Sequence, residues 1–126
     1  MQPTADHIYT PEEANALLPS LRERLARIRD ARQVLLESAE LVRERVAADP
    51  GGAHGGREYW EASAALREEL EGLAAADIVL RDPEAGLVDF PGEREGRRVW
   101  LCWRVGEERV AFWHELEGGF VGRRPL

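Results

Sequence analysis

The chain has 126 residues and a formal net charge of −7 at pH 7, and it contains one cysteine and no lysine. This length suits one domain with a single core, and one cysteine excludes an internal disulfide framework. The absence of lysine excludes P-loop phosphate binding, Schiff-base chemistry and lysine bases, while the acidic balance disfavours nucleic acid as a partner.

The N-terminal residues lack the basic segment and apolar run of a secretion signal. No apolar run approaches the ~20 residues needed to span a bilayer. We therefore expect a protein of the cytoplasm that has no membrane association.

Residues Thr10-Pro11-Glu12-Glu13 predict the start of a helix, with Thr10 as N-cap, Pro11 at the first helical position and Glu13 closing a capping box. From there, apolar residues follow a 4-3 alternation typical of a coiled-coil seam, which only Arg32 interrupts. We expect a helix from about 11 to 47, with a kink near Pro19 or a separate pair of turns before it.

The glycine-rich segment 49–56 predicts a break, and a second amphipathic helix follows at about 57–76. Two long helices joined by a short loop should form an antiparallel hairpin. After Ala76 the periodicity changes to two, which predicts strands at 78–81 and 87–90 with turns at 82–86 and 91–96. Two further runs, RRVWLCWR and RVAFWHE, predict a β-hairpin around a turn at 105–108.

The predicted fold class is therefore α+β. One domain, residues 1–126, contains an antiparallel helical hairpin of coiled-coil-like helices (10–76) and a small four-stranded antiparallel meander (77–115). The tail (116–126) contains too many glycines for a regular element, and we expect it to be irregular.

The turn of the last hairpin decides which side chains share a face. A two- or four-residue turn places Arg104 opposite Arg109, so that Trp100 faces Trp113 and Val99 faces His114. The hairpin then has a core face and a second apolar face that contains both tryptophans. A three- or five-residue turn would shift these pairs, although each strand would keep its own alternation.

Metal binding would use His114, Cys102 and Glu117, since Zn²⁺ needs three or four converging N, S or O ligands. In the register above, His114 and Cys102 point to opposite faces, and the sequence has no CxxC, HxH or HExxH spacing. We predict no metal and no cofactor. A nucleophilic cysteine would need a neighbouring base and an electropositive setting, so no catalytic residue is assigned and an enzyme is the less favoured class.

The leading hypothesis is a non-enzymatic, self-associating module, because the seam and the two-faced hairpin expose more apolar surface than a monomer hides. The simplest form is a symmetric homodimer. The expected interface residues are Trp100, Trp113 and Arg32.

The alternative is a small metal- or ligand-binding protein, or an enzyme, with a site where the sheet meets the tail. The glycines and the two arginines of the tail could bind a carboxylate or a phosphate group. The residues of that site would be His114, Glu115, Arg123 and Asp89.

Three sequence blocks run from one end of the chain to the other: TPEEANALLP, GLVDFP, and LCW followed by WHE and GFxGRxP. With these blocks the chain resembles a family of short bacterial proteins that is catalogued as a domain of unknown function. The resemblance covers essentially the whole chain, and it implies no established activity, substrate or cofactor.

Overall fold

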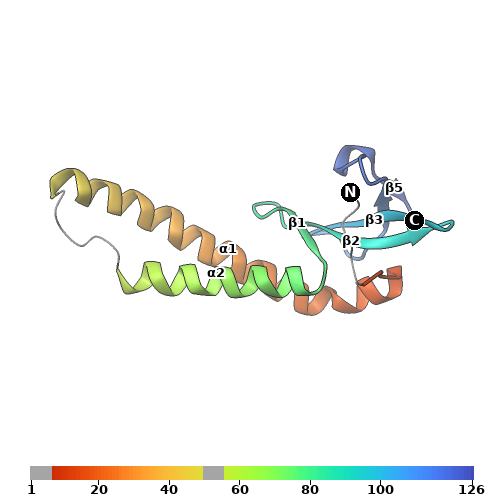
Figure 1. Cartoon of the computed structure of the whole chain (residues 1–126), viewed down its shortest axis with the longest axis horizontal. Helices are drawn as coiled ribbons and strands as arrows, with labels where there is room; N and C mark the ends of the chain where they lie inside the picture. The colour runs from red at the N-terminus through yellow and green to blue at the C-terminus, as the bar shows by residue number, and fades with distance from the viewer. Residues whose placement is uncertain (1–6, 50–55) are drawn as a thin grey trace.

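The computed structural model describes residues 7–49 and 56–126 and shows two helices followed by a five-stranded antiparallel sheet (Figure 1). The helices are α1 (Pro11–Ala48) and α2 (Arg57–Ala75). The strands lie in the sheet in chain order: β1 (Val79–Asp82), β2 (Leu87–Arg94), β3 (Arg97–Arg104), β4 (Phe112–His114) and β5 (Arg124–Pro125). The α+β class and the helical hairpin are confirmed, while most of the predicted break, residues 50–55, lies outside the described residues.

The start of α1 is fixed by the predicted capping box. The backbone N–H of Glu13 donates to Thr10 Oγ1 at 3.1 Å, and the backbone N–H of Thr10 donates to Glu13 Oε1 at 2.9 Å. The helix then continues through Pro19 to Ala48, so the predicted alternative of a separate first pair of turns is wrong. Pro19 is the ninth residue of the helix, so it removes one intrahelical hydrogen bond, the one to the Asn15 carbonyl, and the helix continues past this single loss.

The predicted turn at 91–96 is wrong, because β2 continues to Arg94. The turn shrinks to Glu95-Gly96, whose φ angles of 53° and 78° match a two-residue hairpin turn with both central residues left-handed. Pro91 is tolerated inside β2 because β1 pairs only with residues 87–89. Beyond β1, the carbonyl of Pro91 accepts a hydrogen bond from the backbone N–H of Tyr9 at 2.7 Å.

The core lies between α1 and one face of the sheet. Alternating apolar side chains of the three central strands pack against the first half of α1, and the buried set includes Leu18, Leu21, Leu25, Ile28, Val88, Phe90, Val99, Leu101, Trp103 and Trp113. The tail lies on the opposite side of the sheet from α1 (Figure 1). It contains the 3-10 helix η1 (Phe120–Gly122) and β5, which pairs with β4, so the prediction of a wholly irregular tail is wrong.

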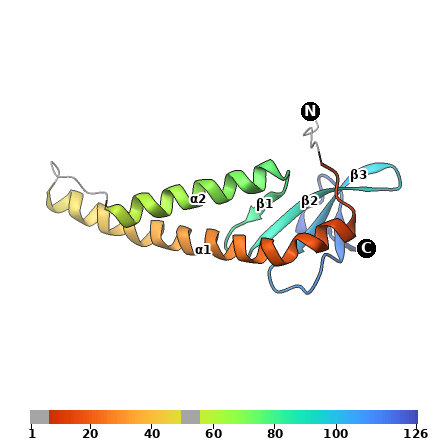
Figure 2. The ribbon, with the colours of Figure 1, turned by 90° about the horizontal axis from the view of Figure 1, so that it is seen from below.

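The outer half of the helical hairpin extends past the sheet (Figure 2). We call this part, residues 32–48 of α1 and 57–70 of α2, the arm. Every buried residue of α1 lies at or before Ala31, so residues 32–48 are at most half-buried. Neither helix of the described chain combines the length and the apolarity that crossing a membrane requires.

Candidate metal centre

Three buried side chains with metal-ligating atoms meet on the sheet face that is turned away from α1. Asp89 of β2 lies directly opposite Cys102 of β3, and His114 of β4 lies opposite Trp100 of β3. Because Trp100 is two residues from Cys102 in the same strand, the side chains of Asp89, Cys102 and His114 all point to one face of the sheet. One ligand atom from each residue lies within 4.8 Å of the other two. All three residues are at most 2% exposed.

This meeting depends on a register that differs from the predicted one. Trp100, Leu101 and Cys102 pair with His114, Trp113 and Phe112, so each pair given for a two- or four-residue turn is wrong by one residue, and the register is shifted as a turn of odd length would shift it. A shift of one residue moves every side chain of one strand to the other face of the sheet, relative to the side chains of its neighbour. The argument that separated His114 from Cys102 therefore fails.

The cause of the shift is the connection between β3 and β4. The turn at 105–108 begins as predicted, with a hydrogen bond from the Glu107 N–H to the Arg104 carbonyl at 3.0 Å. Residues 108–111, however, leave the sheet, and the side chain of Val110 enters the core. Its backbone N–H donates to Asn15 Oδ1 of α1 at 2.7 Å, and this contact fixes where β4 begins.

The two ring nitrogens of His114 both face acceptor groups. Nδ1 lies 2.7 Å from the Glu115 carbonyl oxygen, and Nε2 lies 3.0 Å from Asp89 Oδ1. A carbonyl oxygen only accepts, so Nδ1 donates its proton to it. The Nε2 and Oδ1 atoms then need a second proton, or another cation, between them.

Asp89 obtains its charge partner from β1. The Arg81 Nε atom donates to Asp89 Oδ2 at 2.8 Å, and the guanidinium carbon lies 5.0 Å from the centre of the Trp100 ring. A buried carboxylate without such a partner would be costly. Sequence reasoning missed Arg81, although an aspartate within the apolar strand sequence LVDF signals that a cation must lie nearby.

Cys102 is a thiol and not a ready nucleophile. Burial and the neighbouring carboxylate of Asp89 together raise the pKa of Cys102 to about 12, while Arg123 acts in the opposite direction. At neutral pH the sulfur therefore keeps its proton, and thiolate catalysis is disfavoured. A bound metal ion would displace this proton, because metals bind the thiolate form.

Arg123 holds the tail onto the sheet beside the three residues. Its guanidinium donates to both carboxylate oxygens of Glu107 at 2.8 Å and lies 4.0 Å from the centre of the Phe112 ring. Burial opposes ionisation of Glu107, but the hydrogen bonds from Arg123 and from the Arg104 backbone, with the charges of both arginines, together outweigh it and lower the pKa of Glu107. Arg123 also donates to the Cys102 carbonyl at 3.4 Å. It therefore holds the backbone of Cys102 in position, and its own positive charge is balanced by Glu107.

A cavity of about 340 Å³ adjoins the three buried residues. Glu117 lines this cavity but is not one of the three converging donors, whereas the side chain of Glu115 pairs with Arg97 at 2.8 Å and does not line the cavity. The remaining lining residues come from β1, the start of β2 and the tail: Arg81, Leu87, Leu116, Gly119 and Phe120.

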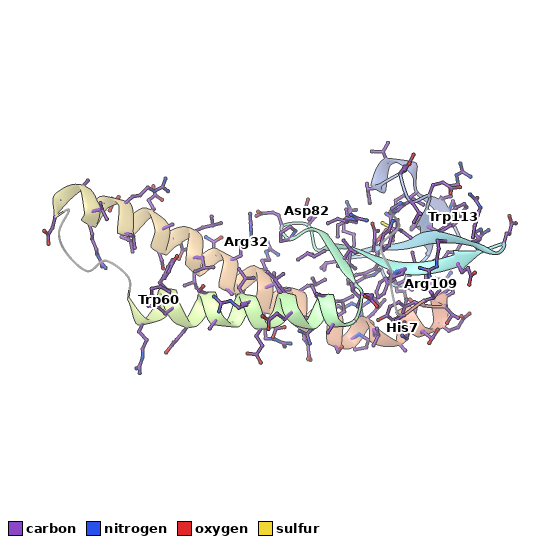
Figure 3. The ribbon with its side chains drawn as sticks, viewed as in Figure 1. His7, Arg32, Trp60, Asp82, Arg109 and Trp113 are labelled. Atoms are coloured by element: carbon purple, nitrogen blue, oxygen red, sulfur yellow. The ribbon has the colours of Figure 1, made fainter. Side chains whose placement is uncertain are left out.

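The expected interface residues do not form one surface. Trp100 and Trp113 are 7% and 6% exposed, and they lie on opposite faces of the sheet because they pair with His114 and Leu101. Figure 3 shows Arg32 on α1 near Asp82 at the end of β1, and Arg32 Nη1 lies 2.8 Å from Glu84 Oε2 of the turn that follows. Arg32 therefore joins α1 to the sheet.

Comparison with known proteins gives a family without a described activity. The family model described as "Uncharacterized conserved protein (DUF2203)" matches residues 7–126. Neither the curated proteins nor the solved structures include a match to the chain.

Proposed function

Since the chain belongs to this family of uncharacterised conserved proteins, we propose from its own geometry that it binds a divalent transition metal through Asp89, Cys102 and His114. One observation carries the proposal: three buried donors converge, and Nε2 and Oδ1 face each other as two acceptors that a proton or a metal ion must join. An O, S and N donor set suits Zn²⁺. A thiolate and a carboxylate would neutralise the charge of a divalent ion.

The surroundings of the three donors suit ligation. The His114 Nδ1 atom donates to a backbone carbonyl, which leaves the Nε2 lone pair for a metal, and Arg81 orients Asp89 through its second oxygen. With bond lengths of ~2.0–2.3 Å, tetrahedral zinc ligands lie about 3.3–3.8 Å apart. The separations of up to 4.8 Å therefore need only small side-chain movements. The adjoining cavity leaves room for a fourth, exchangeable ligand.

Metal loading tests this proposal. Protein stripped with a chelator and then incubated with Zn²⁺ should retain one zinc per chain after desalting, as measured by elemental analysis. At free zinc 100 times the dissociation constant, binding should stabilise the fold by about 2.7 kcal/mol in a thermal melt. With Co²⁺, a sulfur-to-metal charge-transfer absorption should appear, because one ligand is a thiolate.

Two substitutions and one control decide the outcome of the loading experiment. His114→Ala should lose the bound metal, and Cys102→Ser should lose the cobalt charge-transfer absorption. His7→Ala removes a half-exposed histidine that lies against Glu13 and Tyr9 and outside the group of three donors, and it should leave metal content unchanged. Equal metal content in His114→Ala and the unsubstituted protein would refute the assignment.

We propose that the protein acts in the bacterial cytoplasm and folds as a single domain. The proposed thiolate ligand supports this location, because the reducing conditions of the cytoplasm would keep the one cysteine available as a ligand. The family match over residues 7–126 supports treating the chain as one unit.

We also propose that the chain forms a homodimer through the arm. Large apolar side chains remain exposed there, and they are Leu36, Leu41, Val46, Trp60 and Leu70. Trp60 is 64% exposed and lies far from the sheet (Figure 3). Residues 32–48 contain three arginines and three glutamates, so this part of the arm is neutral in a chain of charge −7. Residues 57–70 contain two arginines and four glutamates, so the whole arm has a net charge of only −2. A second arm therefore meets little charge repulsion when it packs as in a four-helix bundle.

Light scattering coupled to gel filtration tests the dimer. At micromolar concentration the mass should be twice the 14.2 kDa of the chain. Trp60→Glu should shift the mass to the monomer, because it places a charge in the apolar contact. Val121→Glu, at a tail residue that is 98% exposed, is the matched control and should remain dimeric. If the unsubstituted chain is monomeric at about 100 µM, a dimer with a micromolar or lower dissociation constant is ruled out.

A further inference from the structure

The cavity beside the three buried donors has the size and walls of a small-molecule site. Its volume of about 340 Å³ is at the lower end of the ~300–1,000 Å³ found for ligand pockets. Leu87, Leu116 and Phe120 give it apolar walls, and Arg81 adds one positive charge. A cavity of this volume with apolar walls favours a molecule with one small apolar group.

Arg81 is held in place but keeps donors available. Its Nε atom is bound to Asp89 Oδ2, and its guanidinium stacks on the Trp100 ring. In the part of the chain that the structure describes, no hydrogen bond uses its two Nη atoms, and the side chain is 43% exposed. A guanidinium fixed at two points presents its remaining donors at low entropic cost, and the fork geometry suits a carboxylate.

The charge of Arg81 bears on what the metal-loaded cavity can bind. In the absence of metal, the guanidinium pairs with Asp89, and a proton lies between His114 Nε2 and Asp89 Oδ1. With a divalent ion present, the thiolate and carboxylate ligands balance the ion, and the charge of Arg81 is left over. The loaded site would then favour one negative charge beside the metal. The carboxylate of Glu117 at the edge of the cavity opposes a second one.

We propose that the metal-loaded cavity binds small monocarboxylic acids with an apolar group. One carboxylate oxygen occupies the open position on the metal, and the other accepts hydrogen bonds from the Nη atoms of Arg81. The apolar group lies against Leu87, Leu116 and Phe120. This inference rests on the proposed metal site and extends it to a class of ligand.

Calorimetric titration of the zinc-loaded protein with benzoate tests this proposal, with benzamide as a neutral molecule of the same shape. Benzoate should bind with 1:1 stoichiometry, and benzamide should bind at least tenfold more weakly, because it lacks the charge. Arg81→Met should weaken benzoate binding about 10- to 100-fold at equal zinc occupancy, the range for a charge-assisted hydrogen bond. Arg57→Met removes the same charge at the far end of α2 and should have no effect.

The outcomes separate the two proposals. A chain that retains no metal overturns both of them. A chain that retains one zinc but does not bind benzoate, or binds benzamide equally well, overturns the carboxylate site alone. Unchanged benzoate affinity in Arg81→Met would also overturn it. In the cobalt-loaded protein, benzoate should shift the visible absorption of the metal, and an unchanged spectrum would contradict direct ligation.

Discussion

Replacement of Asp89 with alanine is expected to lower the free energy of unfolding of the metal-free protein by about 3 kcal/mol. The substitution leaves the His114 Nε2 and the Arg81 Nε without their acceptor, and His114 is 2% exposed. Arg81 is 43% exposed and can turn towards water. The buried imidazole therefore contributes most of the loss, and the expected value lies at the low end for a broken buried pair. Urea unfolding followed by tryptophan fluorescence measures it.

Two further variants serve as comparisons for Asp89→Ala. Asp89→Asn keeps an oxygen for hydrogen bonding but removes the charge, so its effect should fall between those of the unsubstituted protein and the alanine variant. Arg57→Met breaks an ion pair whose side chains are 90% and 70% exposed, and it should cost less than about 0.5 kcal/mol. A loss below about 1 kcal/mol for Asp89→Ala would contradict the view that the buried residues form a connected polar network.

Replacement of Trp103 with alanine is expected to lower the free energy of unfolding by about 3–5 kcal/mol. The side chain is fully buried in the core between α1 and the sheet. Its Nε1 atom donates to the Glu107 carbonyl at 3.1 Å, so the substitution also removes a bond to the turn after β3. Thermal unfolding followed by far-ultraviolet circular dichroism, which does not depend on the lost fluorophore, measures the change.

A conservative variant separates the two contributions of Trp103. Trp103→Phe keeps an aromatic ring but loses the hydrogen bond and some volume, so we expect a smaller cost of about 1–2 kcal/mol. Val121→Ala changes a residue that is 98% exposed and should cost less than about 0.5 kcal/mol. Similar losses for Trp103→Ala and Val121→Ala would show that Trp103 does not anchor the core.

Local patterns in the sequence determined the helices and the existence of four of the five strands. Thr10 and Glu13 are enough to fix the start of α1, because a capping box involves only neighbouring residues. The predicted seam supplies the buried leucines Leu18, Leu21 and Leu25, because a helix of 3.6 residues per turn leaves one stripe for the core. Alternation also indicated correctly which residues of β3 share a face.

The tertiary structure alone decided the candidate site. Alternation has a period of two within each strand, but it does not say how far one strand is displaced along the next. That displacement between β3 and β4 depends on Val110, which is in the core and bound to Asn15, 95 residues earlier in the chain. Because a contact so distant in sequence sets the register, the meeting of Asp89, Cys102 and His114 follows from packing and not from their spacing.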